Sequence, residues 1–351
     1  MRRYTRQLAL PDLDLVKQER LMQAHILMVG AGGLGAVALP YLAGAGIGAI
    51  TIVDHDEVDI TNLHRQTIYR SDQAGQNKAV LAKAYLEGLN PECTVGAITD
   101  RLTGSNAADL VSGSYDVILD GSDNFETKAL LNDLSISLGV PLISASVNQF
   151  SGQIGIFEGY RTDKACYRCL FPKFPTDARN CNEAGILGSS AGLIGVAQAH
   201  LCLSYLLDIE TRVLENFLSF NLKTLDRRAL TVHKDPDCVY CKNADVKAHK
   251  VQVKDTHVVD LISIDNLNDV ETVIVDVRQP EEILADPLVH TQIQTSPLHI
   301  PLPELLDRLN ELPEGMRWAF VCAGNIRSRQ AAEYLSAKGY EKVCILDKFT
   351  I

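Results

Sequence analysis

Residues 26–53 carry no charged side chain, and seven glycines and Pro40 interrupt this apolar stretch. It is long enough to span a membrane, but that many glycines and a proline argue against a membrane helix. "HILMVG" (25–30) is typical of a buried strand, the residues up to about Ala45 of an apolar helix, and "AITIVD" (49–54) of a second strand. Because both strands are almost entirely apolar, we expect a βαβ unit in a parallel sheet that helices cover on both faces.

Length and charge narrow the class of protein further. The chain has 351 residues, enough for two or more domains, and a formal net charge of −11. That charge argues against nucleic acid as the main partner. The N-terminal "MRRYTRQLALPDLDLV" lacks the apolar core of a secretory signal, so we expect a cytoplasmic protein. Nine cysteines, with two C-x-x-C pairs among them, then indicate metal binding and reactive thiols rather than a disulfide framework.

The rest of the chain predicts two α/β domains, residues 1–245 and 258–351, with a polar, Lys-rich linker at 246–257. In the first domain we expect strands at 115–124, 140–147 and 152–158 (the last an edge or antiparallel strand), a helix at 191–207 and antiparallel strands within 217–238. In the second domain we expect strands at 272–278, 317–322 and 342–346, and helices at 302–312 and 328–339.

The glycine-rich turn "GAGGLG" lies between the first strand and its helix, and it predicts a nucleotide site. Glycines there permit a tight turn and let backbone N–H groups approach phosphate at a helix N-terminus. The turn contributes Gly30, Gly32, Gly33 and Gly35, and Asp54 ends the next strand, about where an acidic residue binds a ribose hydroxyl. On these residues alone NAD remains an alternative.

The polar segment after Asp54 favours ATP over NAD. A triphosphate carries more charge than a dinucleotide and needs Arg, Lys and Mg²⁺ to neutralise it. "DHDEVDITNLHRQ" and the following "GQNKA" supply Asp56, Asn62, Arg65, Gln66 and Lys78. "DGSDN" adds Asp120 and Asp123 at the carboxyl end of a strand, where ligands bind in parallel sheets. One of these two carboxylates is expected to hold Mg²⁺.

The two C-x-x-C pairs have the spacing of metal ligands. Four thiolates form a closed tetrahedral zinc site without an open position for catalysis. The pairs are Cys166 with Cys169 and Cys238 with Cys241, so the metal would join two segments that are distant in sequence. A redox C-x-x-C or unrelated buried thiols are the alternatives. Cys93, Cys202 and Cys344 lie in apolar or ordinary settings and are expected to be small core residues.

Cys322 ends the apolar strand "WAFV" and opens the turn "CAGNIRS" before a helix. Backbone N–H groups of this turn, the helix N-terminus and Arg327 would favour a thiolate at Cys322. A thiolate of this kind suits a sulfur atom carried as a persulfide.

The motifs "RYTRQLAL", "GAGGLG", "VDHDEVDITNLHRQ", "GQNKA", "DGSDN" and "CYRCLF" resemble those of the MoeB/ThiF family in the same order. This family is related to ubiquitin-activating enzymes and adenylates the C-terminal glycine of ubiquitin-like sulfur carriers. The resemblance covers about residues 1–245. It implies a Rossmann-like ATP-binding domain with a mixed, mainly parallel sheet and a structural zinc.

The same resemblance assigns roles to residues of this sequence. It implies that Asp54 binds the ribose, Arg65 and Lys78 contact the phosphates, Asn62 and Gln66 shape that site, and Asp123 rather than Asp120 holds Mg²⁺. It further implies that Arg6 reaches the ATP site of the other subunit of a homodimer. Cys181 lies in "ARNCNEAGILG", where ThiF-like members can bond covalently to the carrier and other members do not need the cysteine.

"VDVRQPEE" (275–282), the turn at Cys322 and "SRQAAEYLSAKGY" resemble a rhodanese domain over about residues 258–351. This resemblance implies that Cys322 carries sulfur and that Arg327 and the loop amides stabilise its anionic form. The early position of Gly324 and the absence of "GHIPGA" leave open a domain that only docks a sulfur donor.

The function we expect is adenylation of a carrier that ends in Gly-Gly, followed by sulfur transfer from Cys322 that leaves a thiocarboxylate. The expected sulfur source is a donor such as a cysteine desulfurase. An NAD-dependent oxidoreductase with a structural zinc is the alternative. The sequence does not distinguish molybdopterin, thiamin, tRNA-thiolation or other carriers.

Overall fold

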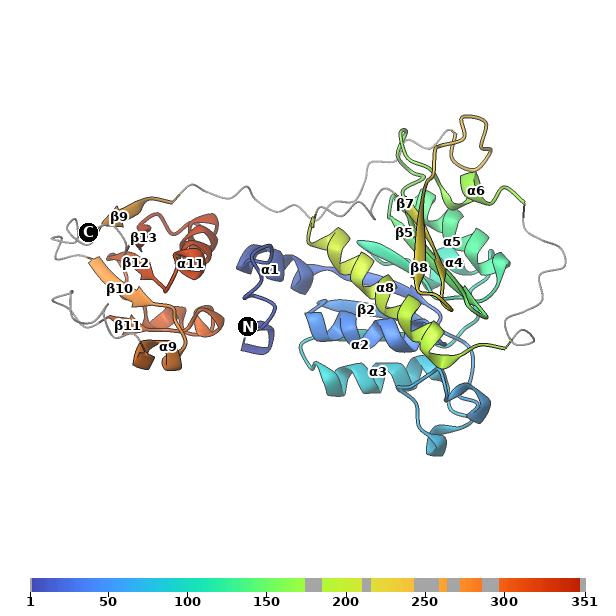
Figure 1. Ribbon diagram of the computed structural model, residues 1–351, viewed down its shortest axis with the longest axis horizontal. Coiled ribbons are helices and arrows are strands. Elements are labelled where there is room, and N and C mark those ends of the chain that lie inside the picture. The colour runs from blue at the N-terminus through green and yellow to red at the C-terminus, as the bar shows by residue number, and fades with distance from the viewer. Residues whose placement is uncertain are drawn as a thin grey trace. The chain divides into compact units, whose positions relative to one another are not determined.

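The computed structural model describes residues 2–173, 185–209, 216–242, 259–263, 272–285 and 297–347. Cys181 and the linker expected at 246–257 lie outside these ranges. The chain divides into two compact units, one formed by Arg20–Val251 and the other by Met1–Glu19 together with Gln252–Ile351. Figure 1 shows the elements of both units. No helix in the described ranges has the length and apolar character needed to cross a membrane.

The larger unit is built on an eight-stranded sheet in the order β3-β2-β1-β4-β5-β6-β7-β8. The strands β3, β2, β1, β4 and β5 are parallel, and β6, β7 and β8 are antiparallel additions. The strand at 151–157 is therefore antiparallel, as one of the two alternatives predicted, but it does not lie at the edge. The bounds are β1 His25–Val29, β2 Ala49–Val53, β3 Thr94–Ile98, β4 Val117–Asp120, β5 Leu142–Asn148, β6 Ser151–Phe157, β7 Asn216–Asn221 and β8 Asp226–Thr231.

The order of the strands fixes where a ligand can bind. The chain runs from β1 to β2 and β3 on one side, and then returns to place β4 and β5 on the other side of β1. In open parallel sheets such a reversal leaves a crevice at the carboxyl ends of the two central strands. All four residues of β4 are buried, as are four of the five in β1, which confirms that the middle of the sheet is covered on both faces.

Helices cover this sheet. The long helix α8 packs on α2 and on β5, α3 packs on β2 and β3, and α5 packs on β4 and β5. Pro40 lies inside α2, as its position in the sequence indicated. The bounds are α2 Gly35–Ala45, α3 Lys78–Leu89, α4 Ala107–Leu110, α5 Phe125–Leu138, α6 Tyr167–Leu170 and α8 Gly188–Leu206. Helix α1 (Leu15–Gln23) includes residues of both units.

The smaller unit contains a five-stranded parallel sheet in the order β11-β10-β12-β13-β9. Its strands are β9 Leu261–Ser263, β10 Thr272–Asp276, β11 Leu298–His299, β12 Arg317–Val321 and β13 Val343–Asp347, and its helices are α9 Pro280–Ala285 and α11 Ile326–Ala337. The three strands and the helix predicted at 328–339 are thus present.

The prediction of a helix at 302–312 is wrong. The segment forms two short 3-10 helices, η6 (Leu302–Glu304) and η7 (Leu309–Glu311). The N–H groups of Leu305, Glu311 and Leu312 donate to carbonyls three residues back, as in 3-10 turns. Arg308, with a φ of −120° and a ψ of 19°, leaves the helical conformation between the two turns. The apolar spacing reflects burial of Leu302, Leu305 and Leu312 from separate turns rather than from one helical face.

Candidate functional site

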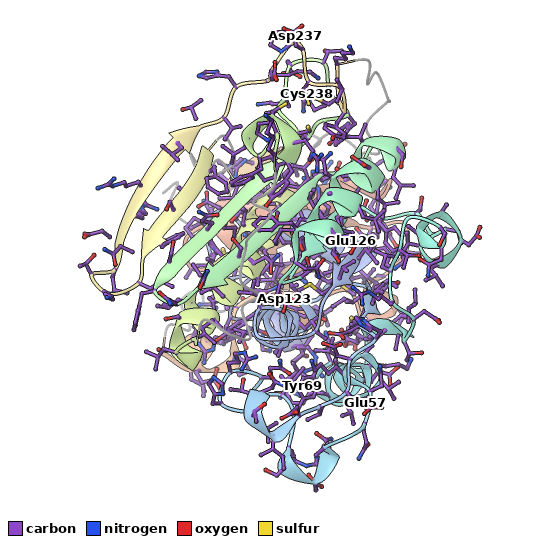
Figure 2. The ribbon with its side chains drawn as sticks, turned by 90° about the vertical axis from the view of Figure 1, so that its right-hand side faces the viewer. Glu57, Tyr69, Asp123, Glu126, Asp237 and Cys238 are labelled. Atoms are coloured by element: carbon purple, nitrogen blue, oxygen red, sulfur yellow. The ribbon has the colours of Figure 1, made fainter. Side chains whose placement is uncertain are left out.

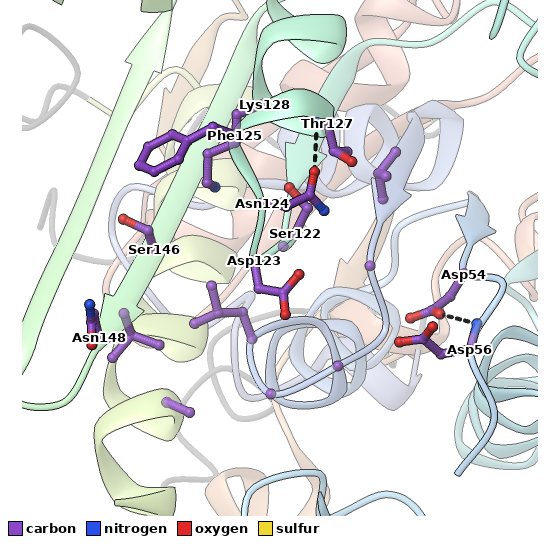
Figure 3. Close-up of a pocket in the computed structure, with 18 of the residues that line it drawn as sticks. Asp54, Asp56, Ser122, Asp123, Asn124, Phe125, Thr127, Lys128, Ser146 and Asn148 are labelled. Atoms are coloured by element: carbon purple, nitrogen blue, oxygen red, sulfur yellow. Dashed lines mark hydrogen bonds between the residues drawn. The ribbon is translucent and has the colours of Figure 1, made fainter. Parts of the chain in front are cut away.

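A cavity of about 1000 Å³ lies in the crevice beside β1 and β4. It is lined by the glycine-rich turn, by the polar segment after β2, by the turn after β4 and by the ends of β5 and β6. Lining residues include Gly30, Gly32, Gly33, Asp54, Asp56, Asn62, Arg65, Gln66, Lys78, Ser122, Asp123, Asn124, Lys128, Ser146 and Asn148. The structure therefore brings together most of the nucleotide-site residues that the sequence indicated. Figure 3 shows Asp123 on one side of this cavity and Asp54 and Asp56 on the other.

Two glycines of the turn are required by close backbone approach. Gly30 has a φ of +95°, and a Cβ there would lie 2.8 Å from the carbonyl oxygen of Gly121. A Cβ on Gly35, the first residue of α2, would lie 2.0 Å from the carbonyl oxygen of Gly30. The turn thus closes tightly against the segment after β4, and its backbone borders the cavity at the N-terminus of a helix, where anions are stabilised.

Asp54 connects the end of β2 to the glycine-rich turn. Its Oδ2 accepts a hydrogen bond from the Ala31 N–H at 2.7 Å, and its Oδ1 accepts one from the Asp56 N–H at 2.9 Å. Burial raises the pKa of Asp54, and the hydrogen bond from Asp56 opposes that shift. Each carboxylate oxygen keeps a further lone pair for a ligand.

The cations of the cavity are positioned by neighbouring polar groups. Lys78 is the first residue of α3, is buried, and its Nζ lies 3.1 Å from Asp56 Oδ2. Arg65 Nη2 donates to Asn62 Oδ1 at 2.5 Å. Gln66 is 3% exposed, and its Oε1 has no partner within the part of the chain that the structure describes. All of these groups line the cavity.

The structure separates the two candidate carboxylates for Mg²⁺. Asp123 is exposed and lines the cavity. Asp120 is fully buried, and its oxygens accept hydrogen bonds from Lys128 Nζ at 2.7 Å, Ser144 Oγ at 2.6 Å and Ser122 Oγ at 2.6 Å. The Asp120 carboxylate therefore already accepts hydrogen bonds from other groups of the protein. The geometry favours Asp123 as the carboxylate that faces a ligand.

Sequence analysis missed Lys128. It lies on α5 with a relative exposure of 4%, and its Nζ also donates to the Ala145 carbonyl at 2.9 Å. Its neighbours one turn and two turns on, Asn132 and Ser135, are also polar, so the sequence does not mark Lys128 as buried.

The four paired cysteines come together as the spacing predicted. The Sγ atoms of Cys166 and Cys169 lie 3.7 Å apart, those of Cys166 and Cys238 3.8 Å, and those of Cys169 and Cys241 3.6 Å. Tetrahedral zinc with Zn–S bonds of about 2.3 Å requires S···S separations of about 3.8 Å, so this cluster fits that ion. Figure 2 shows Cys238 and Asp123 at separate places on the unit, and none of the four cysteines lines the cavity.

In the smaller unit, Cys322 follows β12 and is buried. The backbone N–H of Ser328 donates to Cys322 Sγ at 3.4 Å, and Ser328 Oγ lies at the same distance. Arg327 forms two hydrogen bonds of 2.6 Å to Glu282 of α9, which hold the pKa of Glu282 at about 2. Sequence analysis identified Arg327 but not this partner.

The remaining predicted residues are placed as follows. Arg6 is exposed in the N-terminal segment, so its role at another subunit stays a prediction. Cys93, Cys202 and Cys344 are buried, as expected of core residues.

This architecture defines a nucleotide-binding α/β protein with a tetrathiolate cluster and a second, cysteine-bearing α/β domain. The ThiF family matches residues 4–240 and the rhodanese-like domain matches residues 263–349. The chain therefore belongs to the ThiF family and carries a rhodanese-like domain.

Several characterised proteins are similar to it. A sulfur carrier protein adenylyltransferase of Thermus thermophilus is 39% identical over 244 residues, which cover 68% of this chain and 90% of the relative. The sulfur carrier protein ThiS adenylyltransferase of Escherichia coli is 37% identical over 245 residues, 69% of this chain and 96% of the relative. The adenylyltransferase and sulfurtransferase UBA4 of Kluyveromyces lactis is 43% identical over 225 residues, 63% of this chain but half of the relative's length.

A solved structure of E. coli MccB with ATP supports the fold. It superposes with a TM-score of 0.56 at 20% identity, over 65% of this chain and 68% of that one.

Proposed function

We propose that this protein uses ATP to adenylate the C-terminal glycine of a ubiquitin-like sulfur carrier and then transfers sulfur to the activated carboxyl group. The observation that carries the first step is the cavity, which combines a glycine-rich helix N-terminus with Lys78, Arg65 and Asp123. Membership of the ThiF family supports the same reading.

Adenylation makes the carboxyl group reactive. A carboxylate resists attack because its leaving group would be oxide, whereas an acyl adenylate has AMP as its leaving group. One carboxylate oxygen of the carrier attacks the α-phosphorus of ATP, and pyrophosphate departs with the electrons of the broken P–O bond. Lys78 and Arg65 would stabilise the charge that develops on the phosphates, because cations in a partly buried site act strongly on it.

The other residues of the site have supporting roles. Asp54 would bind the ribose, and Asn62 and Gln66 would fix the shape of the phosphate wall. Asp123 would hold Mg²⁺, which supplies further charge neutralisation when bound. We assign Arg6 to the ATP site of a second subunit, which makes the active form a homodimer. The four cysteines Cys166, Cys169, Cys238 and Cys241 would hold Zn²⁺ and join the segment after β6 to the segment after β8.

Sulfur transfer is assigned to Cys322. Its persulfide attacks the carbonyl carbon of the acyl adenylate and AMP leaves, which gives an acyl disulfide. A second thiol then attacks Cys322 Sγ, and the carrier thiocarboxylate leaves with the electrons of the S–S bond. Cys181 is the candidate for that thiol within this chain or for a covalent bond to the carrier. The sulfur donor would be a persulfide-bearing protein such as a cysteine desulfurase, in the cytoplasm.

Thiamin, molybdenum-cofactor and tRNA-thiolation pathways use carriers of this kind, and each remains a candidate pathway. A domain that only docks a sulfur donor is the competing function for the rhodanese-like part. The variant Cys322→Ala distinguishes sulfur transfer by this domain from docking of a donor alone. With wild-type protein, ATP and a Gly-Gly carrier should yield acyl-AMP and then, with a persulfide donor, a thiocarboxylate detected by mass. Cys322→Ala should still give acyl-AMP and no thiocarboxylate. Normal sulfur transfer by this variant would contradict the assignment.

A further inference from the structure

Two arginines near Cys322 each form a salt bridge with a carboxylate. Arg278, which is 1% exposed, donates to both carboxylate oxygens of Asp276, with the shortest contact at 2.7 Å. Arg327, which directly precedes Ser328 at the sulfur, donates through both Nη atoms to Glu282 at 2.6 Å. Both pairs have the forked geometry that makes arginine–carboxylate contacts strong.

The two pairs differ in their access to solvent. The Asp276–Arg278 pair is buried, with side chains 0% and 1% exposed. In the other pair, the Arg327 side chain is 26% exposed and that of Glu282 38%. A small solute can therefore reach Arg327, and it would meet a guanidinium whose two terminal nitrogens already serve Glu282. The Glu282 carboxylate adds a negative charge at the same place.

This arrangement affects sulfur donors unequally. Thiosulfate is a dianion and releases sulfite, also a dianion, so its reaction at a cysteine thiolate needs an available cation. The persulfide group of an organic donor brings at most one negative charge to the reacting sulfur and releases a thiolate, which the loop amides and the helix N-terminus can accommodate. Glu282 thus raises the cost of binding an oxyanion while it leaves the loop backbone unchanged.

We propose that Glu282 is a specificity-determining residue that excludes small oxyanion donors such as thiosulfate and selects organic persulfides as the sulfur source of Cys322. The inference rests on the proposed sulfur transfer at Cys322 and assigns the choice of its donor to one residue.

Sulfur transfer from an organic persulfide to Cys322 needs no oxidant. The Cys322 thiolate attacks the outer sulfur of R–S–SH, the donor S–S bond breaks, and R–S⁻ leaves with its electron pair. The proton stays on the transferred sulfur until the loop environment releases it. With thiosulfate the same attack would release sulfite, which carries two negative charges.

The test compares two donors on the full-length protein. Persulfide on Cys322 is measured by mass after incubation with glutathione persulfide or with thiosulfate, and the initial rates give kcat/KM for each donor. Wild-type protein should load from glutathione persulfide and poorly from thiosulfate. Glu282→Gln keeps the side-chain shape, removes the charge and should raise kcat/KM for thiosulfate by about tenfold, the gain expected from one available charge-assisted contact. Loading from glutathione persulfide should change less than about twofold, within the variation of a surface substitution.

Matched variants test whether the gain in kcat/KM for thiosulfate comes from the Glu282–Arg327 pair. Glu281→Gln removes a charge from the exposed neighbour on α9 and should leave both rates unchanged. Glu282→Gln combined with Arg327→Gln should lose the gain, because the cation is gone. Glu282→Asp retracts the carboxylate and should give a smaller gain, and this variant carries the test if Glu282→Gln does not fold.

An unchanged preference in Glu282→Gln and Glu282→Asp overturns the inference but leaves sulfur transfer intact. Efficient use of thiosulfate by the wild-type protein overturns it as well. If Cys322 of the wild-type protein loads from neither donor, the proposed sulfur transfer itself fails and the inference falls with it.

Discussion

The buried pair between Lys128 and Asp120 provides the strongest stability prediction for the larger unit. Lys128 is 4% exposed and Asp120 is fully buried, with 2.7 Å between Nζ and Oδ2. Lys128→Met preserves the length of the side chain but leaves a buried carboxylate without its cation. Loss of one partner from a buried ion pair costs about 3–5 kcal/mol, because the remaining charge cannot be solvated. The two serine hydroxyls that still donate to Asp120 place the expected loss near the lower end of that range.

The effect should be visible in unfolding. For a unit of this size, 3 kcal/mol corresponds to a fall in Tm of about 6–12 °C. Urea titration followed by circular dichroism measures the free energy directly. Arg70→Met serves as a control, since Arg70 forms an exposed pair with Asp72 whose contribution is about 0–1 kcal/mol. Lys128→Met combined with Asp120→Asn should recover part of the stability. A single variant Lys128→Met that unfolds within 1 kcal/mol of the wild type would refute the reasoning.

Three further predictions concern the other parts of the molecule. Lys78→Ala should lower the rate of ATP–pyrophosphate exchange by at least about 100-fold, as expected for loss of a cation on the transferred group, and Arg70→Ala, an exposed arginine, should not. Cys166→Ser should lower the zinc content measured by atomic absorption and lower Tm, and an unchanged stoichiometry would exclude the tetrathiolate site. The hydrogen bonds from Arg327 lower the pKa of Glu282 from 4.5 to about 2. The ionised carboxylate should therefore stabilise the smaller unit at neutral pH, and this stabilisation should disappear as the pH falls from about 5 towards 2. Trp318, the single tryptophan, lies on β12, and its fluorescence reports unfolding of that unit. In Glu282→Gln, the free energy of unfolding should fall less as the pH is lowered.

Much of the architecture follows from local patterns in the chain. Continuous apolar runs ending in glycine or aspartate identified β1, β2 and β4, and the glycine-rich turn indicated where the cavity lies. The segment at 302–312 has helical spacing, but Arg308 leaves the helical conformation and separates two 3-10 turns.

Long-range pairing is the part that the sequence could not supply. Lys128 finds Asp120 and Ala145 only after α5 has packed on the sheet. Glu282 and Arg327 are 45 residues apart and belong to different helices. The cysteine spacing predicted a metal site, and only the fold brings Cys166 within 3.8 Å of Cys238.

The central claim is that the cavity exists to join a carboxyl terminus to AMP. The most direct measurement is exchange of labelled pyrophosphate into ATP by the purified wild-type protein, with magnesium and a panel of small carriers that end in Gly-Gly. The account predicts exchange with at least one carrier, none without a carrier, and none when the terminal glycine is removed. Absence of exchange with every carrier, together with tight binding of NADH, would contradict it.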